Sequence, residues 1–160
     1  MSKIIVAADH GGLACKNEIK AWLTAAGIQV VDVGAEKLVS DDDYSTWARA
    51  AVVAKKADTE AKIIAWCRSG VGMCIALNRA PGIYATVATD ERALAAAVAD
   101  DHINALCLAA DYTDLSVQKT LIGVFLETDV RQEERFGRRL SAVERMGQEF
   151  YADNSSDFAI

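Results

Sequence analysis

Residues 62–73 read KIIAWCRSGVGM, and this stretch decides the fold class. Its first half is a short apolar run without polar alternation, which is typical of a strand buried on both faces of a parallel sheet. Its second half is a glycine-punctuated turn that contains Gly70 and Gly72 and begins a helix. A buried strand that leads directly into a helix indicates an α/β protein.

The same order of elements recurs along the chain. Segments with helical spacing separate five short apolar runs, so we predict a mostly parallel five-stranded sheet covered by helices. The predicted strands are Lys3–Ala8, Gln29–Val33, Lys62–Trp66, Ile83–Ala88 and Ala105–Ala109. The predicted helices are Leu13–Ala26, Tyr44–Lys56, Val71–Asn78, Glu91–Ala99 and Leu115–Leu126.

The charged stretch Arg131–Phe150 predicts a final helix. Leu140, Val143 and Met146 fall on one stripe of this helix. An apolar stripe on an otherwise charged helix indicates packing on a partner subunit.

Length and composition favour one domain. The chain has 160 residues, of which 52% are hydrophobic, and it has a single proline and no Gly/Ser-rich linker. We therefore predict one domain over residues 1–150 and a loosely ordered tail over residues 151–160.

Charge and cysteine content argue against several kinds of partner. The net charge is −6, so binding to nucleic acid or to an anionic membrane is disfavoured. No apolar run approaches the roughly 20 residues that span a bilayer, and we expect a cytoplasmic protein. The four cysteines are widely spaced with no C-x-x-C pair, so neither disulfides nor a metal site is expected.

Polar residues follow the first predicted strand directly, as Asp9-His10-Gly11-Gly12. In open parallel sheets, ligands gather outside the carboxyl ends of the strands, which makes this carboxylate and this imidazole candidate binding groups. The two glycines let the backbone turn tightly into the next helix. The alternative is that Asp9 caps that helix and His10 is a solvated loop residue.

Cys67 follows the third predicted strand and precedes the glycine turn. Arg68 and the helix start favour its ionised thiolate form, so Cys67 is a candidate general base or nucleophile. Exposed backbone N–H groups of the turn could hold an oxyanion. The alternative is a small buried hydrophobic residue, which is also our interpretation of Cys15, Cys74 and Cys107.

A further polar segment, residues 100–104, reads Asp-Asp-His-Ile-Asn and precedes the fifth predicted strand. Residues before a strand lie at the opposite edge of a parallel sheet from residues that follow one. This segment therefore joins the other candidates only if a neighbouring subunit brings it back.

Arg135, Arg138 and Arg139 form a cluster in an acidic protein. Paired guanidinium groups suit a phosphate. The alternative is a solvated helix face with ion pairs to Glu133 and Glu134.

Together these motifs resemble the ribose-5-phosphate isomerase B and galactose-6-phosphate isomerase family over roughly residues 3–145. The matching elements are Asp9-His10-Gly11-Gly12, Asp43-Tyr44, Cys67 to Met73 with Asn78, and Arg135 with Arg139. The resemblance implies a flavodoxin-like (Rossmann-like) three-layer α/β/α sandwich and an aldose–ketose isomerase of a small phosphorylated sugar, without metal or organic cofactor. It also implies a homodimer, or a tetramer, whose active sites form between subunits, with the terminal arginines reaching across to the substrate phosphate.

The resemblance also assigns roles to single residues. Cys67 moves a proton between two carbons through a cis-enediolate, and Ser69 stands where the family usually has threonine. A carbon acid beside a carbonyl needs such a base together with stabilisation of the developing oxyanion. The residues implied in substrate binding are Asp9, His10, Tyr44, Arg68, Gly70, Val71, Gly72, Asn78, Asp101, Arg135 and Arg139.

The chain departs from the family at the residue that opens the sugar ring. Family members usually carry His-Asn-Asp before the fifth strand, with the histidine opening the furanose, whereas this chain reads Asp100-Asp101-His102. The aligned residue is Asp100, and His102 lies two residues later, several ångströms along an extended segment. We keep both as candidate catalytic residues.

Three more departures concern anion recognition. Tyr84 stands where the family has arginine, Phe136 stands where it has histidine, and Arg68 replaces a glycine beside the thiol. These changes predict a substrate other than ribose 5-phosphate. A tetrose or tetrulose 4-phosphate cannot close a furanose because its O4 is esterified, so it needs no ring-opening residue, and we hypothesise such a substrate.

Several alternatives stay open from the sequence. One is a different substrate, such as ribose 5-phosphate, another pentose or hexose phosphate, or an unsaturated uronate degradation product. Another is a non-catalytic phosphosugar-binding subunit, because one of the paired galactose-6-phosphate isomerase subunits lacks the thiol; the presence of Cys67 argues against it. The third is a flavodoxin-like binding or signalling domain.

Overall fold

The computed structural model describes residues 3–152, over which strands and helices alternate as predicted. The strands are β1 (Ile4–Ala8), β2 (Val30–Asp32), β3 (Lys62–Cys67), β4 (Ala85–Val87) and β5 (Ala105–Ala109). The helices are α1 (Leu13–Ala25), α2 (Tyr44–Ala57), α3 (Val71–Leu77), α4 (Glu91–Asp101), α5 (Leu115–Glu127) and α6 (Glu134–Ala152).

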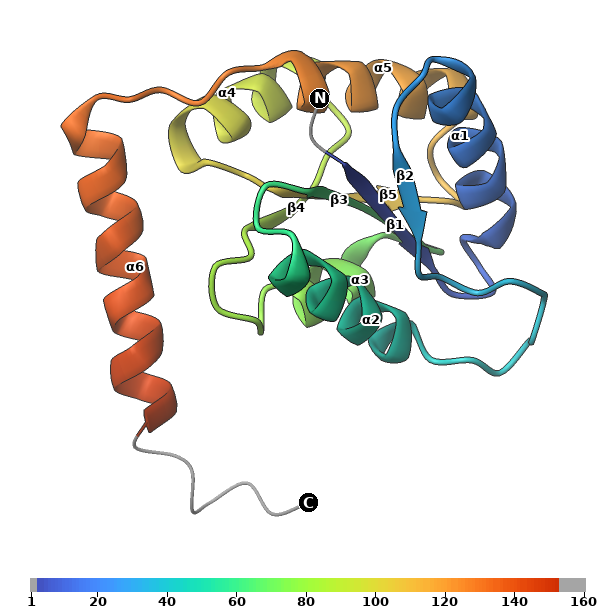
Figure 1. The fold of residues 1–160 in the computed structure, drawn as a ribbon, viewed down its shortest axis with the longest axis horizontal. Helices are drawn as coiled ribbons and strands as arrows, with labels where there is room; N and C mark the ends of the chain where they lie inside the picture. The colour runs from blue at the N-terminus through green and yellow to red at the C-terminus, as the bar shows by residue number, and fades with distance from the viewer. Residues whose placement is uncertain (1–2, 153–160) are drawn as a thin grey trace.

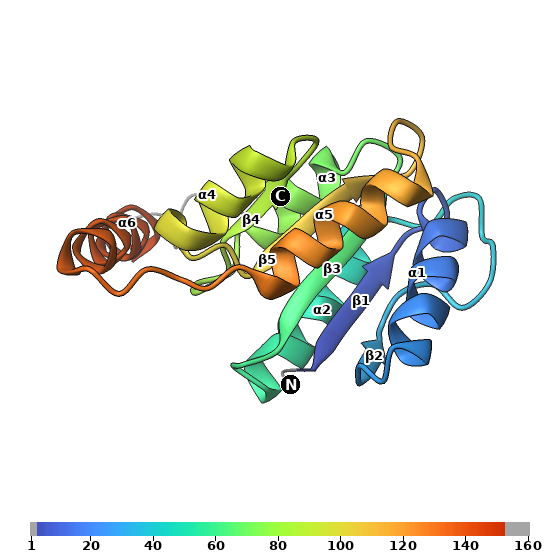
Figure 2. The ribbon, with the colours of Figure 1, turned by 90° about the horizontal axis from the view of Figure 1, so that it is seen from above.

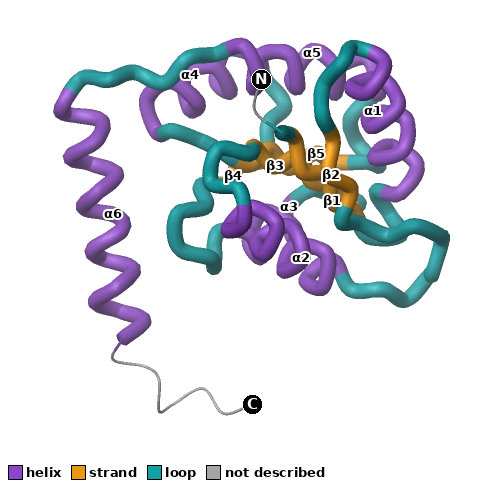
Figure 3. The backbone as a smooth tube through the Cα atoms, viewed as in Figure 1, coloured by secondary structure: helices purple, strands orange, loops and turns teal. Residues whose placement is uncertain are grey.

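All neighbouring strands pair in parallel, in the order β2-β1-β3-β5-β4. Figure 3 shows these strands gathered between the helices. The predicted parallel sheet is therefore confirmed. The order differs from the flavodoxin order 2-1-3-4-5 because β5 lies between β3 and β4. The sequence of β5, ALCLA, is buried throughout and suits an inner strand, whereas the three residues of β4 are only half-buried and suit an edge.

Helices cover both faces of the sheet, which confirms the three-layer sandwich (Figure 1). Helices α1, α4 and α5 pack on one face and α2 and α3 on the other. Alternate residues of β1 serve the two cores: Ile4 and Val6 face the first layer, and Ile5 and Ala7 face the second. Burial on both faces explains why this strand has no polar alternation.

Helix α6 extends away from the body of the domain after an extended segment (Figures 1 and 2). Its apolar stripe is exposed at Val143, Met146 and Phe150. Packing of this stripe on a partner subunit stays a prediction. The predicted tail begins at residue 151, but α6 runs to Ala152, and the remainder of the tail lies outside the described residues.

None of the helices within residues 3–152 is long and apolar enough to cross a membrane.

Candidate active site

Cys67 is the last residue of β3 and lies at the carboxyl edge of the sheet. It is 5% exposed and packs with Ile63, Ala65 and Met73 in the core between the sheet and helices α2 and α3. The sequence offered two interpretations of this residue, a buried hydrophobic residue and a reactive thiol at a strand end. The structure agrees with both, because Cys67 is buried and also lies at the end of its strand.

The turn after Cys67 requires a glycine at position 70. Gly70 has a φ of 75°, a left-handed conformation, and a Cβ there would lie 3.1 Å from the carbonyl carbon of Leu108. The Val71 N–H lies 3.4 Å from the Ser69 hydroxyl oxygen, which accepts from it. The backbone of residues 68–72 therefore wraps around the end of β3 directly beside the thiol.

Gly72 brings Tyr44 to this turn. A Cβ on Gly72 would lie 2.9 Å from the ring of Tyr44, the first residue of α2, so the ring is packed against the bare backbone. Tyr44 is partly exposed, which leaves its hydroxyl group accessible. The predicted neighbourhood of Tyr44 and the glycine turn is present in the structure.

Asp9 and His10 lie beside the thiol because β1 pairs with β3. Ala8 is opposite Trp66 in the ladder, so Asp9 follows β1 where Cys67 ends β3. The carboxylate of Asp9 is buried and accepts the N–H of Gly12 at 3.1 Å. Asp9 therefore holds the turn before α1, whose N-cap is Gly12 rather than Asp9.

His10 has a partner that the sequence did not reveal, Asp42. One oxygen of Asp42 accepts the backbone N–H of His10 at 2.8 Å and lies 2.6 Å from its ring Nδ1. The other oxygen accepts the indole N–H of Trp47 at 2.8 Å. The hydrogen bond to Asp42 raises the pKa of His10, and the nearby charge of Asp9 adds to this. The three consecutive aspartates at 41–43 carry no signal that singles out the middle one.

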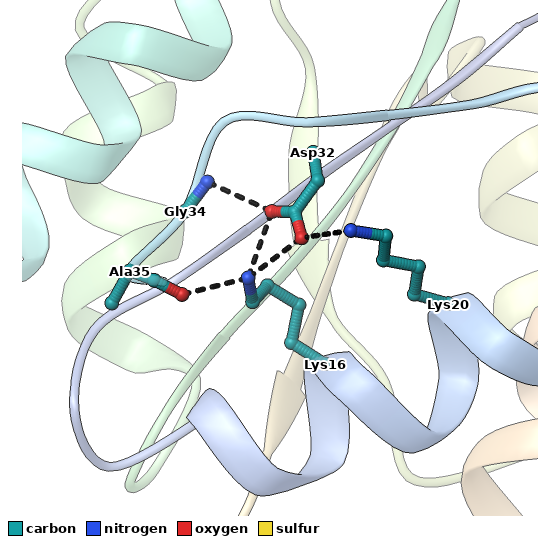
Figure 4. A network of polar contacts seen from close by, with 5 residues as sticks. All are labelled: Lys16, Lys20, Asp32, Gly34 and Ala35. Carbon is teal, nitrogen blue, oxygen red and sulfur yellow. Dashed lines mark hydrogen bonds and ion pairs between the residues drawn. The ribbon is translucent and has the colours of Figure 1, made fainter. Parts of the chain in front are cut away.

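The loop that carries Asp42 is anchored by a buried ion-pair network (Figure 4). The ammonium group of Lys16, 1% exposed, lies 2.8 Å from both carboxylate oxygens of Asp32 and from the Ala35 carbonyl oxygen. Lys20 and the Gly34 N–H also donate to Asp32. Burial alone would raise the pKa of Asp32, but these hydrogen bonds outweigh it and lower that pKa.

Arg68 crosses the mouth of the site. A Cβ on Gly11 would lie 2.7 Å from Cγ of Arg68, so the arginine stem runs over the turn that follows β1. Its guanidinium group is well exposed and pairs with Asp111 at 3.1 Å. The structure thus places Arg68 on the rim, beside the thiol but with its charge directed toward a loop after β5.

We call the region around Cys67 the thiol edge; its predicted residues are Asp9, His10, Tyr44, Cys67, Arg68, Ser69, Gly70, Val71 and Gly72. The remaining predicted residues lie elsewhere in the same chain, in a region that we call the arginine edge; they are Asn78, Asp100, Asp101, His102, Arg135 and Arg139.

Asp100 and Asp101 lie in the last turn of α4, which is longer than the predicted helix that ended at Ala99. Asp100 forms an ion pair with Arg131 at 2.9 Å. His102 ends the helix in a left-handed conformation, with a φ of 54°, and its Nε2 lies 3.1 Å from the Arg131 carbonyl oxygen. These contacts tie α4 to the segment that leads into α6.

Arg135 and Arg139 lie in the first turns of α6 and stack on Phe136. Their guanidinium carbons are 4.6 Å and 6.0 Å from the centre of its ring, and that of Arg131 is 5.8 Å away. Phe136 is itself buried. The aromatic ring therefore gathers two arginines of the predicted cluster, Arg135 and Arg139, together with Arg131, which was not part of that cluster.

Asn78 closes the end of α3 onto β4. Its amide group donates to the Ala85 carbonyl oxygen at 2.9 Å and accepts the Ala85 N–H at 2.9 Å. A groove of about 870 Å³ runs between the turn 78–84 and α6. Glu144 and Tyr84 are among the residues that line this groove, and Cys67 is not.

The two edges are too far apart to act together in one subunit. In the parallel ladder of β3 and β5, Cys67 is opposite Ala109 and Ile63 is opposite Ala105. The first residue of β5 is therefore displaced by four residues from Cys67 along the strand direction. At about 3.3 Å per residue this separation is at least about 13 Å, and residues 100–102 lie further back still. The sequence-based expectation that these residues occupy opposite edges is confirmed for the single chain.

Cys74 differs from its interpretation as an inert core thiol. Its sulfur lies 3.4 Å from the Ala85 carbonyl oxygen and is half-buried. A hydrogen bond with Cys107 lowers the pKa of Cys74 to about 7 and, together with burial, raises that of Cys107. Cys74 is therefore a second thiol to control for when Cys67 is modified chemically.

A sequence model of a known family, described as Ribose/Galactose Isomerase, matches residues 4–143. The chain belongs to the ribose/galactose isomerase family. A probable ribose-5-phosphate isomerase B of Mycoplasma pneumoniae is 32% identical over 145 residues, which cover 89% of this chain and 95% of the relative. Ribose-5-phosphate isomerase B of Mycobacterium tuberculosis is 30% identical over 88% of this chain and 87% of the relative.

Solved structures agree with the family. Ribose-5-phosphate isomerase B from Mycoplasma genitalium, solved with bound ribulose 5-phosphate, superposes with a TM-score of 0.85 at 30% identity, covering 92% of this chain and 97% of that one. The enzyme from Clostridium thermocellum superposes with a TM-score of 0.86 at 26% identity, covering 92% and 99%. As a ribose/galactose isomerase, the chain is an aldose–ketose isomerase of sugar phosphates.

Proposed function

We propose that the chain interconverts an aldose phosphate and a ketose phosphate through a cis-enediolate, with Cys67 as the base. The observation that supports this most strongly is the arrangement of the thiol edge, where Cys67, Asp9 and His10 follow two paired strands. The thiolate removes a proton from the carbon next to the carbonyl and returns it to the neighbouring carbon. Backbone N–H groups of residues 68–72 stabilise the negative oxygen that forms between these steps.

The phosphate, in this proposal, is bound by Arg135 and Arg139 of a second subunit. Within one chain these arginines belong to the arginine edge, too far from Cys67 for a sugar phosphate held by both. The extended position of α6 and its exposed Val143 and Met146 suit a helix that reaches onto a partner. Two guanidinium groups already gathered on Phe136 provide the paired donors that a phosphate requires.

The proposed substrate is a tetrose or tetrulose 4-phosphate, which has no furanose form. The residues near the ring-opening position are engaged within the chain itself: Asp100 pairs with Arg131, and the His102 ring contacts the Arg131 carbonyl oxygen. Neither the Asp100 carboxylate nor Nε2 of His102 can act as an acid for the ring oxygen without breaking its contact. An open-chain substrate requires no such acid.

Ribose 5-phosphate is the second candidate substrate. It is favoured by a relative at 30% identity whose structure holds ribulose 5-phosphate. The two candidate substrates differ by one carbon and by the need for ring opening. Turnover of both by the same enzyme preparation distinguishes them.

The test is proton exchange in heavy water with a panel of four-, five- and six-carbon aldose and ketose phosphates, followed by NMR at C1 and C2. We expect exchange and interconversion on erythrose 4-phosphate and erythrulose 4-phosphate, lost in Cys67→Ser and kept in Cys74→Ser. Faster turnover of ribose 5-phosphate would overturn the substrate proposal. Silence of the wild type across the panel would overturn the catalytic one and favour a phosphosugar-binding subunit.

A further inference from the structure

We propose that Asp42 is a positioning residue of the active site, which accepts the Nδ1–H of a protonated His10 ring and so directs the Nε2–H to an anionic oxygen of the substrate. The inference rests on the proposed function for the role of His10 toward a phosphosugar. The geometry of the Asp42–His10 pair itself does not depend on which sugar is bound.

The hydrogen bonds fix the ring from two points. The same oxygen of Asp42 accepts the backbone N–H of His10 at 2.8 Å and lies 2.6 Å from ring Nδ1. An ionised carboxylate can only accept hydrogen bonds, so Nδ1 must carry the hydrogen. Within residues 3–152, Nε2 has no hydrogen-bond partner, and it is therefore the nitrogen left for a ligand.

Asp42 is itself held in place, unlike a typical surface ion pair. Its side chain is 12% exposed, and its second oxygen accepts the indole N–H of Trp47 at 2.8 Å. Trp47 packs against the core under α2 and α3. At the other end of the loop, the Lys16–Asp32 network anchors its first residues to α1. The carboxylate is thus oriented from both sides, which a solvated charge pair would not require.

The electrostatic surroundings favour a protonated His10. The acidic groups that face the ring are Asp42 and Asp9, and both raise its pKa, with the Asp42 hydrogen bond as the largest cause. The stem of Arg68 passes over Gly11, and its charge is paired with Asp111. A protonated ring donates through Nε2, which suits an anionic phosphate or enediolate oxygen.

The chemical role of His10 in this proposal is to transfer protons to and from the substrate oxygens, while Cys67 transfers the proton between the carbons. An aldose–ketose interconversion transfers one proton between two carbons and another between two oxygens. A single base that acts on carbon leaves the transfer between the oxygens without a catalytic group. His10 lies in the turn that follows β1, next to the strand that ends in Cys67. Because Asp42 holds the His10 ring in one rotamer, little conformational entropy is lost when the ring binds the substrate oxygen.

The resting protein tests the pair directly, because the chain has only two histidines, His10 and His102. Proton–nitrogen NMR of the imidazole groups, with His102→Gln to assign the signals, reports the tautomer and the pKa of His10. We expect hydrogen on Nδ1 in the wild type. In Asp42→Asn, which keeps the size and loses the charge, we expect the pKa of His10 to fall toward its ordinary value. The matched control is Asp41→Asn, at an exposed neighbouring carboxylate.

Turnover then tests the role. We expect Asp42→Asn to lower kcat/KM about 10- to 100-fold through misplacement of the ring, with unchanged far-UV circular dichroism. Because activity needs protonated His10, it is lost as the pH rises through the pKa of His10, so the alkaline limb of the pH profile should move to lower pH in Asp42→Asn. Trp47→Phe removes one hydrogen-bond partner of Asp42 and no charge. It should lower kcat/KM by a smaller factor, through a less firmly held carboxylate, and serves if the Asn variant unfolds.

The outcomes separate the two proposals. If His10 titrates alike in the wild type and Asp42→Asn, or if the pH profiles coincide, Asp42 does not position the ring and the inference is overturned. If the NMR signals change as expected but no sugar phosphate is turned over by the wild type, the proposed function fails, and the link between Asp42 and substrate fails with it.

Discussion

The thiol edge and the arginine edge of this domain are built in opposite ways. At the thiol edge, Cys67 is buried in a core of strand and helix residues, and Lys16 and Asp42 brace the surrounding loops from within the same chain. At the arginine edge, α6 projects from the body after an extended segment. Arg131 of that segment pairs with Asp100 of α4, and Glu144 of α6 accepts a hydrogen bond from the hydroxyl group of Tyr84. The thiol edge is thus held by contacts within the chain, whereas Val143 and Met146 of α6 are exposed.

In the shared active site that we propose, this difference assigns proton transfer and phosphate binding to different edges. Proton transfer at carbon needs a base fixed within fractions of an ångström, which the packed thiol edge provides. Phosphate binding tolerates more freedom because paired charges attract over several ångströms. Changes at the thiol edge should therefore affect catalysis or folding strongly, whereas changes at the arginine edge should affect substrate binding.

The largest effect on turnover is expected for Cys67→Ser. Loss of the base should lower kcat by about 10²–10⁴-fold, because a serine hydroxyl is far less acidic than a thiol. Inhibition by inorganic phosphate should stay unchanged, since we propose that Arg135 and Arg139 of the arginine edge bind the phosphate. Steady-state kinetics measure both, and Cys74→Ser, at a thiol outside the turn, is the matched control. A serine variant with near wild-type kcat would exclude Cys67 as the base.

The next largest effect is on stability, from Lys16→Met. Removal of a buried ammonium group leaves Asp32 with part of its charge uncompensated, which should cost about 3 kcal/mol of unfolding free energy. Chemical denaturation measures this, and Lys20→Met, at an exposed partner of the same carboxylate, should cost under about 1 kcal/mol. Equal losses in the two variants would show that burial of Lys16 contributes nothing.

The same network predicts acid sensitivity. Since the pKa of Asp32 is lowered in the folded state, its contribution to stability is present above the unfolded carboxyl pKa of about 4 and is lost as the pH falls through the folded value. Asp32→Asn should be less stable than the wild type at pH 7, and this difference should shrink as the pH falls below about 4.

A smaller effect is expected for Arg139→Ala at the arginine edge. Loss of one charged hydrogen-bond donor should raise KM by about 10- to 100-fold and leave kcat within a fewfold. Arg138→Ala, one residue earlier on the same helix, should change KM little and controls for net charge. If Arg139→Ala lowered kcat as Cys67→Ser does, the division between the edges would be wrong.

The smallest effect is expected for His102→Ala. On an open-chain tetrose phosphate, turnover should stay within about threefold of the wild type, because such a substrate needs no ring opening and the loss of His102 removes only its contact with the Arg131 carbonyl oxygen. The measurement is the ratio of kcat/KM on a tetrose and on a pentose phosphate. The substrate proposal would be refuted by a wild type that handles the cyclising pentose well and loses it in His102→Ala.

Much of the thiol edge could be predicted from the sequence because its signals are local. The run before Cys67 and the glycines after it specify a strand, a turn and a helix in adjacent residues, and parallel pairing brings Asp9 alongside. The partner of His10 could not be predicted, since Asp42 is 32 residues away in a loop whose path depends on the buried Lys16. At the arginine edge, the helix was predictable but its direction was not, because it depends on contacts of Arg131 with α4.

The most direct test of the shared site is complementation between two inactive subunits. Cys67→Ser and Arg135→Ala/Arg139→Ala chains, co-expressed with different tags, form mixed dimers in which one of the two sites carries no substitution. With random pairing, the mixture should recover about a quarter of wild-type kcat/KM, since half of the dimers are mixed and half of their sites are intact. Activity no higher than the sum of the two parents would contradict a site built from both subunits and place the arginines outside it.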